Sequence, residues 1–220
     1  MGSGDLGGSR MTVILLLHGN EEARRRFEEA ASARVIVVRR SDVAAYDALP
    51  AQVPRIADLA DVTPGERLLV FAFSAGAWAL RRYLTNPENR AAVSAAVFLD
   101  GLYGAVGDEC SLSPYAGVVA YGREANANPE RARLVMTYSA AHPAPAICSL
   151  AVWHATGSGP GVEVRGYSSS DHNAQLTEVG PAIAREITVP PRRSSFPVLP
   201  LFLFTAAAAI AWRIFSRRLA

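Results

Sequence analysis

The chain has 220 residues, half of them hydrophobic, which is enough for one sizeable domain with its own core. All 22 basic residues are arginines and the formal net charge is +2. Five of these arginines lie beyond residue 190, where no acidic residue occurs, so the other 17 face 20 acidic residues. A mildly acidic body without a clustered basic face weighs against a nucleic-acid-binding protein.

The first eleven residues lack the apolar core of a secretory signal peptide, and we interpret 1–11 as a disordered leader. The other end differs, because residues 196–212 carry no charge and lie between two arginine-containing segments. Such a helix spans roughly 25 Å, slightly less than a hydrocarbon core. Arg213 could snorkel to the interface and extend the span through Phe215. A core helix, the alternative, would show a polar face, and this segment has none.

We therefore predict a linker at 190–195, a transmembrane helix at 196–215 and a basic tail at 216–220. Arginines flank both ends of the span, so its orientation stays open. Without a signal peptide, the folded domain is expected in the cytoplasm, anchored to a membrane by the C-terminal helix.

Between these ends, strand-like and helix-like segments alternate. Continuous apolar runs or strand-type residues predict strands at 12–19, 34–40, 66–74, 91–100, 132–139 and 161–168. Helical spacing predicts helices at 20–33, 54–62, 75–86 and 173–187, the first with Asn20 as its N-cap, the third ended by Pro87 and the last interrupted near Gly180 and Pro181.

Two intervals break this alternation. Residues 101–130 contain Gly, Tyr, Ser and Pro without clear periodicity, which is typical of a lid or binding loop or of a disordered segment. Residues 140–161 are similar, with a short helix at 147–154. The regular part predicts an α/β fold with a doubly wound, mostly parallel sheet of about six strands, whose functional groups lie at the carboxyl ends of the strands.

Three reactive side chains follow predicted strands. Ser74 ends the third strand, Asp100 ends the fourth, and His172 follows the sixth in the sequence SSSDHN. A serine is a weak nucleophile at neutral pH, so it needs a base within hydrogen-bond reach and a group that orients the base. Ser74, His172 and Asp100 supply a nucleophile, a base and an orienting group, in that order.

The segment Ala72-Phe73-Ser74-Ala75-Gly76 resembles the nucleophile elbow of the α/β-hydrolase superfamily, with alanine in place of the first glycine. The resemblance covers roughly residues 12–189 and implies a trimmed version of that fold. It also implies an oxyanion hole formed by the backbone N–H groups of Ala75 and Asn20. His18, just before Asn20, is interpreted as shaping that loop.

The acid of the triad has two candidates. Many members of the superfamily carry it after the strand that corresponds to 132–139, where this chain has no carboxylate. Asp100, one strand earlier, is a position that some members use, and Asp171, next to His172, is the second choice. Each residue also has a purely structural interpretation: a small residue at a turn for Ser74, a turn cap for Asp100 and a surface histidine for His172.

The two cysteines, Cys110 and Cys148, fit neither a disulfide framework nor a metal site, and we favour buried thiols over a bond between them. His142 and His154 are interpreted as structural or exposed. Four aromatic residues in the two irregular intervals either line a pocket or pack a lid: Tyr103, Tyr115, Tyr121 and Trp153.

These residues predict a serine hydrolase that cleaves an acyl ester through an acyl-enzyme, without a metal or organic cofactor. A membrane anchor would favour an amphiphilic or lipid-like substrate. Two alternatives stay open: a catalytically inactive binding module of the same fold, tethered to a membrane, and an acyltransferase that uses the same three residues. The oligomeric state is not predicted.

Overall fold

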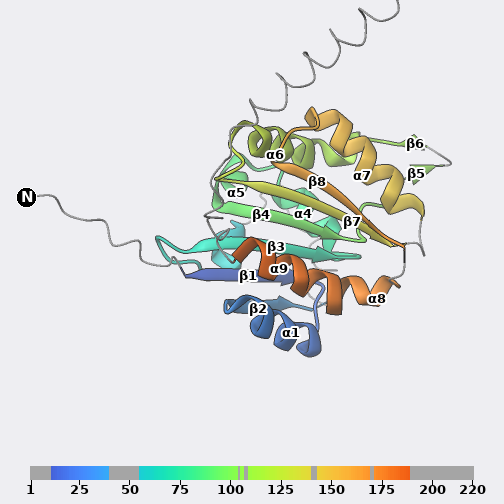
Figure 1. Cartoon of the computed structure of the whole chain (residues 1–220). Coiled ribbons are helices and arrows are strands. Elements are labelled where there is room, and N and C mark those ends of the chain that lie inside the picture. Colours follow the sequence, from blue (N-terminus) through green and yellow to red (C-terminus); the bar gives the residue numbers. More distant parts are fainter. Residues whose placement is uncertain are drawn as a thin grey trace, which may run out of the picture. The chain divides into compact units, whose positions relative to one another are not determined.

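The computed structural model describes residues 11–39, 55–103, 105–106, 109–139, 143–168 and 171–188. Six parallel strands form its centre, in the spatial order β2-β1-β3-β4-β7-β8 (Figure 1). They are β1 (Thr12–Leu17), β2 (Arg34–Val38), β3 (Arg67–Phe73), β4 (Val93–Leu99), β7 (Arg133–Ser139) and β8 (Val162–Tyr167). Each lies within a segment that the sequence predicts as a strand.

The central strands are buried on both faces, as their unbroken apolar runs indicate. In β1, Val13, Leu15 and Leu17 join one hydrophobic cluster, and Ile14 and Leu16 join the other. This alternation follows from the two-residue period of a strand. The sheet therefore separates two apolar layers, each of which needs a cover of helices.

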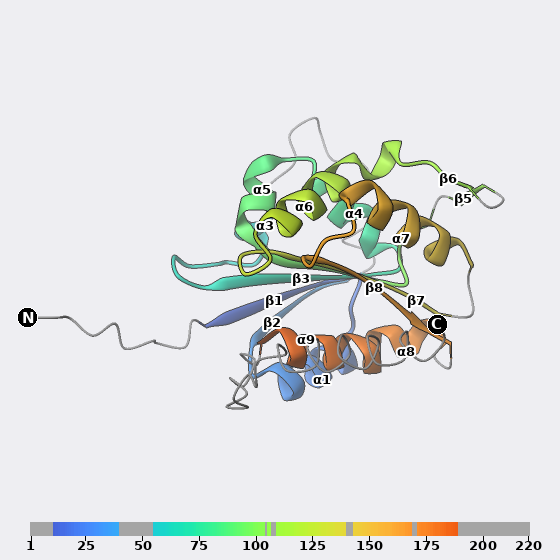
Figure 2. The same cartoon turned by 45° about the horizontal axis from the view of Figure 1, so that its top comes forward.

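Helices supply both covers (Figure 2). One face carries α1 (Glu21–Ala31) and α9 (Gly180–Thr188). The opposite face carries α3 (Ile56–Leu59), α4 (Gly76–Tyr83), α5 (Pro87–Ala92), α6 (Ala116–Ala127) and α7 (Pro143–Thr156). A parallel sheet covered on both faces is the doubly wound class that the sequence predicts.

Two predictions about helix ends have different outcomes. Asn20 caps α1 as predicted, because its side-chain oxygen accepts a hydrogen bond from the N–H of Ala23 at 2.8 Å. Pro87, however, does not simply end a helix. The preceding helix α4 ends at Tyr83, and Pro87 occupies the first turn of α5, where a missing N–H costs nothing.

The interval 101–130 is more ordered than the sequence suggests. It contains an antiparallel hairpin of β5 (Ala105–Val106) and β6 (Glu109–Cys110), a 3-10 turn η1 (Ser113–Tyr115) and the helix α6. The two glycines of α6 obscured its helical pattern. A Cβ at Gly117 would lie 2.6 Å from the backbone carbon of Leu84, so this glycine permits close packing and does not break the helix.

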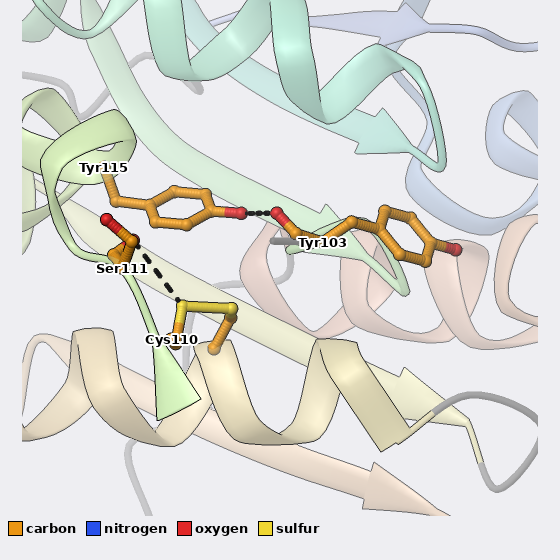
Figure 3. The surroundings of a disulfide bond; sticks show 5 residues. Tyr103, Cys110, Ser111 and Tyr115 are labelled. Carbon is orange, nitrogen blue, oxygen red and sulfur yellow. Dashed lines mark hydrogen bonds between the residues drawn. A yellow bond between two sulfur atoms is a disulfide. The ribbon is translucent and has the colours of Figure 1, made fainter. Parts of the chain in front are cut away.

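The helix α7 is also longer than the predicted 147–154. It contains Cys148, for which the prediction of a buried thiol has to be corrected. Its Cys148 forms a disulfide with Cys110 of β6, with Cα atoms 5.1 Å apart (Figure 3). The favoured interpretation as two buried thiols was therefore wrong. The pairing depends on the hairpin lying against α7, which the sequence separation of 38 residues does not reveal.

The predicted leader lies outside the described residues except for Met11, and the linker 190–195, the transmembrane helix 196–215 and the basic tail 216–220 lie wholly outside them. In the part of the chain that is described, no helix has the length and apolar character needed to cross a membrane.

Candidate active site

Ser74 stands on a sharp turn between β3 and α4. Its φ of 48° lies in the left-handed region, which is unusual for a residue with a side chain and is found at strained functional turns. Its N–H donates to the carbonyl of Leu99 at 3.2 Å, which ties the turn to the end of β4. Helix α4 begins two residues later at Gly76. The chain therefore makes a tight strand-to-helix turn at Ser74.

Crowding explains why small residues surround Ser74. A Cβ at Gly76 would lie 2.3 Å from the carbonyl oxygen of Leu17, at the end of β1. A Cβ at Gly101 would lie 2.7 Å from the Cβ of Ala77 and 3.2 Å from the carbonyl oxygen of Ser74. The ends of the neighbouring strands β1 and β4 therefore leave no room for larger side chains around this turn.

Asp100 follows β4 directly and is fully buried. The carboxylate accepts two hydrogen bonds from Ser139 at the end of β7: one from the backbone N–H to Oδ1 at 3.0 Å, and one from the hydroxyl to Oδ2 at 2.8 Å. Its own N–H donates to the carbonyl of Thr137 at 3.1 Å. These bonds satisfy a buried charge and fix its orientation.

His172 is the first residue of α8 (His172–Ala174), and its Nδ1 lies 2.7 Å from Oδ2 of Asp100. Because a carboxylate only accepts hydrogen bonds, Nδ1 donates in this pair, and in the neutral ring the lone pair is then on Nε2. The ring also packs on Phe73, the residue before Ser74, with centroids 4.6 Å apart.

The other carboxylate considered from the sequence, Asp171, is exposed and caps α8 by accepting from the N–H of Ala174 at 2.7 Å. Of the two candidate acids, Asp100 is therefore the one that contacts the imidazole.

The helix after His172 is anchored to the sheet. A π-helical segment, η2 (Gln175–Val179), connects α8 with α9. The buried side chain of Gln175 accepts from the hydroxyl of Thr137 at 2.6 Å. Because Pro181 has no backbone N–H, it cannot donate to the carbonyl of Thr177. The guanidinium of Arg26 in α1 donates to that carbonyl instead, at 3.4 Å. The predicted interruption near Gly180 and Pro181 is thus a local change of helix type, common near functional sites.

The two residues predicted for the oxyanion hole lie at helix starts on the same edge of the sheet. Ala75 is the N-cap of α4 and Asn20 the N-cap of α1. Since β1 and β3 are paired through Leu17 and Ala72, both loops leave neighbouring strands. The first N–H groups of a helix have no acceptor within it, which makes them suitable donors to an anion.

His18 fits the interpretation that it shapes the loop after β1. Its φ is 64°, and its N–H donates to the carbonyl of Val38 at 2.9 Å. Its ring lies 5.7 Å from that of Phe73, measured between centroids.

No protein-family model matches the chain, and no curated protein matches it either. Among solved structures, it is similar to a lipase-esterase related protein from Clostridium acetobutylicum ATCC 824, with 12% identity over 82% of this chain and 95% of that chain and a TM-score of 0.49. It is also similar to an esterase of Pyrobaculum calidifontis, with 17% identity over 82% of this chain and 77% of that chain and a TM-score of 0.48. Likeness at this level transfers no activity or residue role to this chain.

Two site residues escaped the sequence analysis. Ser139 holds the carboxylate of Asp100, and the only signal was its position at the end of a strand. Tyr103 was considered only as a lining or packing aromatic, but it lies on the turn that follows Asp100, where its N–H donates to the carbonyl of Gly101 at 3.1 Å. Burial, followed by the nearby carboxylate of Asp100, raises the pKa of Tyr103 to about 12.

The remaining candidates lie away from these contacts. Tyr115 and Tyr121 are buried in the core on the α6 side, and the rings of Trp153 and His154 meet edge to face within α7. His142 lies outside the described residues. Within the described ranges, no cluster of three or more His, Cys, Asp or Glu side chains could hold a metal ion.

Proposed function

We propose that the protein is a serine hydrolase that cleaves acyl esters with Ser74, His172 and Asp100. The single observation that supports this most is the 2.7 Å bond between His172 Nδ1 and the buried Asp100, beside an elbow whose serine has a φ of 48°. A buried carboxylate that orients an imidazole leaves Nε2 as a base for a nearby hydroxyl.

In the proposed reaction, His172 Nε2 takes the proton of Ser74 while the serine Oγ attacks the carbonyl carbon. The C=O electron pair moves to oxygen, and the N–H groups of Ala75 and Asn20 donate to the oxyanion. When the carbonyl re-forms, the bond to the alcohol breaks, and His172 returns its proton to the leaving alkoxide. Water, activated by His172, then releases the acid from the acyl-enzyme, while Asp100 stabilises the transient imidazolium.

A fluorophosphonate probe tests this proposal, because it forms a covalent bond only with an activated serine. The wild-type protein should be labelled and Ser74→Ala should not. Labelling must also be lost when the protein is unfolded in urea. Absence of labelling on the folded wild-type protein would favour the binding module instead.

Hydrolysis and acyl transfer use the same acyl-enzyme and differ only in the acceptor. Product analysis of a short-chain p-nitrophenyl ester, with and without added alcohol, separates them. Formation of free acid in the presence of alcohol supports a hydrolase, whereas predominant formation of the new ester supports an acyltransferase.

The lipid-like substrate and the membrane anchor are parts of the same proposal. Protein truncated before Arg192 should keep its activity on soluble esters and lose it on esters presented in phospholipid vesicles. Equal loss on both substrates would contradict a positional role for the C-terminal segment.

A further inference from the structure

Phe73 is the last residue of β3, and its ring contacts the candidate base. The side chain belongs to the hydrophobic cluster on the face of the sheet that α1 and α9 cover, and the residue is 6% exposed. The centroid of its ring lies 4.6 Å from that of the His172 imidazole, with an angle of 34° between the two planes. Flat rings this close and this nearly parallel overlap in an offset stack. One face of the imidazole therefore lies against Phe73.

The position of Phe73 is fixed by the sheet. Strand β3 lies between β1 and β4, and Phe73 is paired with Leu99, the last residue of β4. The next residue, Ser74, donates its N–H to the carbonyl of the same Leu99 at 3.2 Å. The ring that contacts the candidate base and the candidate nucleophile are thus neighbours on one strand end, and their relative placement follows from the backbone.

His172 reaches this strand end from a distant part of the chain. It begins α8, which in Figure 2 lies beside α9 on the same side of the sheet as α1. Leu176, in the following segment η2, belongs to the same hydrophobic cluster as Phe73. The side chain of His172 is 26% exposed, so protein does not enclose the ring on every side. Its orientation therefore depends on the groups that do contact it.

The bond to Asp100 does not by itself fix the plane of the imidazole. A hydrogen bond at Nδ1, here of 2.7 Å, sets the position of that atom, and the ring can still turn about it. Such a turn would change the direction in which Nε2 points. The contact with Phe73 opposes it, because an imidazole turned toward Phe73 would enter the space that the phenyl ring occupies.

We propose that Phe73 is a positioning residue: its ring supports one face of His172 and so directs Nε2 toward Ser74. This proposal rests on the proposed function above. Phe73 takes up and releases no proton, and it acts only through His172. Since β3 carries both Phe73 and Ser74, the strand end that presents the nucleophile also sets the direction of its base.

Phe73→Leu tests the proposal, because leucine keeps an apolar side chain and lacks a flat face. His172 is the base in both steps of the proposed reaction, so kcat on p-nitrophenyl acetate should fall whichever step is slower. A misplacement of about 1 Å costs up to roughly 10²-fold in rate, and for a smaller displacement we expect a decrease of about tenfold. Both steps slow together, so KM should change by less than about threefold. The rate of fluorophosphonate labelling should fall by a factor similar to that for kcat.

Phe71→Leu is the matched control. Phe71 lies two residues earlier on the same face of β3, is fully buried, and packs edge to face with Phe27 of α1, with centroids 4.9 Å apart. The variant makes the same change in the same hydrophobic cluster, further from the end of the strand. It should lower the midpoint of thermal unfolding at least as much as Phe73→Leu and leave kcat within about threefold of the wild-type value. Circular dichroism verifies that both variants are folded.

A second pair of variants tests the flat ring itself. Phe73→Tyr keeps it and should retain at least about a third of the wild-type kcat. Phe73→Met also lacks a flat face, and it replaces Phe73→Leu in the comparison if the leucine variant does not fold. A kcat of Phe73→Tyr as low as that of Phe73→Leu would contradict a role for the ring face.

The remaining results separate this inference from the proposed function. Wild-type kcat in folded Phe73→Leu, with Ser74 labelled at the wild-type rate, would overturn the role of Phe73 alone. An equal decrease in kcat for Phe73→Leu and Phe71→Leu would indicate a general structural effect and also overturn that role. A wild-type protein that is not labelled at Ser74 would overturn the proposed function, and this inference with it.

Discussion

Asp100 combines a buried charge with a reactive partner. Both carboxylate oxygens accept from Ser139, and Oδ2 also contacts the imidazole of His172. An isolated buried carboxylate would cost several kcal/mol, so these donors are what make the ionised form tolerable there. The same bonds prevent the carboxylate from rotating away from the imidazole. The orientation of His172 therefore depends on a residue one strand further along the sheet.

We expect Asp100→Asn to lower kcat by about 10³- to 10⁴-fold with little change in KM. Asparagine has the same shape and can still accept from the N–H of Ser139. Its amide nitrogen, placed toward His172, would favour protonation of the imidazole on Nε2, the nitrogen that must act as base. Steady-state kinetics on a soluble ester measure the effect.

The control for this prediction is Asp171→Asn. Asp171 caps α8, and asparagine is an equally good N-cap, so kcat should stay within about threefold of the wild-type value. A larger decrease in kcat for Asp171→Asn than for Asp100→Asn would show that Asp171, and not Asp100, orients the imidazole.

At the scale of elements, the elbow depends on how closely β1 approaches α4. The φ of Gly76 lies outside the left-handed region, but a Cβ there would lie 2.3 Å from the carbonyl oxygen of Leu17. Backbone atoms of a central strand cannot move as a side chain can. The glycine is therefore required by packing between two elements, not by a special φ.

Gly76→Ala should lower the free energy of unfolding by about 3 kcal/mol and displace Ser74 enough to reduce fluorophosphonate labelling. Gly65→Ala provides the contrast, because Gly65 has a φ of 95° and no atom within 4 Å of an added Cβ. That variant should cost about 1 kcal/mol from backbone strain alone, with labelling unchanged. Urea unfolding and labelling rates test both variants. Equal decreases in the free energy of unfolding would contradict a steric origin of the effect of Gly76→Ala.

A second pair of elements is joined by charge. Arg165 of β8 forms two hydrogen bonds to Glu186 of α9, at 2.8 and 2.9 Å. The hydrogen bonds from Arg165 hold the pKa of Glu186 below its ordinary value of 4.5, against a smaller opposing effect of burial. A carboxyl whose pKa is lowered by folding stabilises the protein above its unfolded pKa. That contribution is lost as the pH falls through the folded pKa.

Glu186→Gln should therefore destabilise the protein by less than about 1 kcal/mol at pH 7, because the pair is half exposed and screened. The difference from the wild type should shrink as the pH falls from about 4.5, the ordinary pKa of the unfolded chain, through the lower pKa of the folded carboxyl. Urea unfolding at several pH values measures it. Glu178→Gln, an exposed change on η2, should have an effect below about 0.5 kcal/mol at any pH. A difference between Glu186→Gln and wild type that is independent of pH would contradict an ionic origin.

Apolar runs made the sheet predictable, since a strand buried on both faces has few alternatives. The same runs placed Ser74 and Asp100 at one edge, because parallel strands share a carboxyl end. Helix α6 was missed, since Gly117 permits close packing and resembles a helix breaker in the sequence. The hydrogen bonds from Ser139 to Asp100 join the ends of two neighbouring strands, and the pattern within a single strand does not reveal such a contact.

At the scale of the whole molecule, the disulfide joins a segment near the candidate active site to the helical layer above the sheet. Cys110 and Cys148 enclose the hairpin end, the whole of α6 and the strand β7. A bond of this kind is typical of proteins in oxidising compartments and rare in the cytosol. It therefore weighs against the cytoplasmic location expected from the sequence, which stays a prediction.

Replacing both cysteines, as Cys110→Ser with Cys148→Ala, should lower the free energy of unfolding by about 2–4 kcal/mol, because the closed loop of 38 residues no longer restricts the unfolded chain. Dithiothreitol should destabilise the wild-type protein by a similar amount and leave the double variant unchanged. Urea unfolding in both conditions measures this. The compartment can be tested by labelling denatured protein from its natural source with a maleimide. If no thiol reacts before reduction, the cysteines are oxidised in the cell, which supports an oxidising location. Two reactive thiols, with a wild-type stability that dithiothreitol does not alter, would contradict a disulfide that stabilises the native fold.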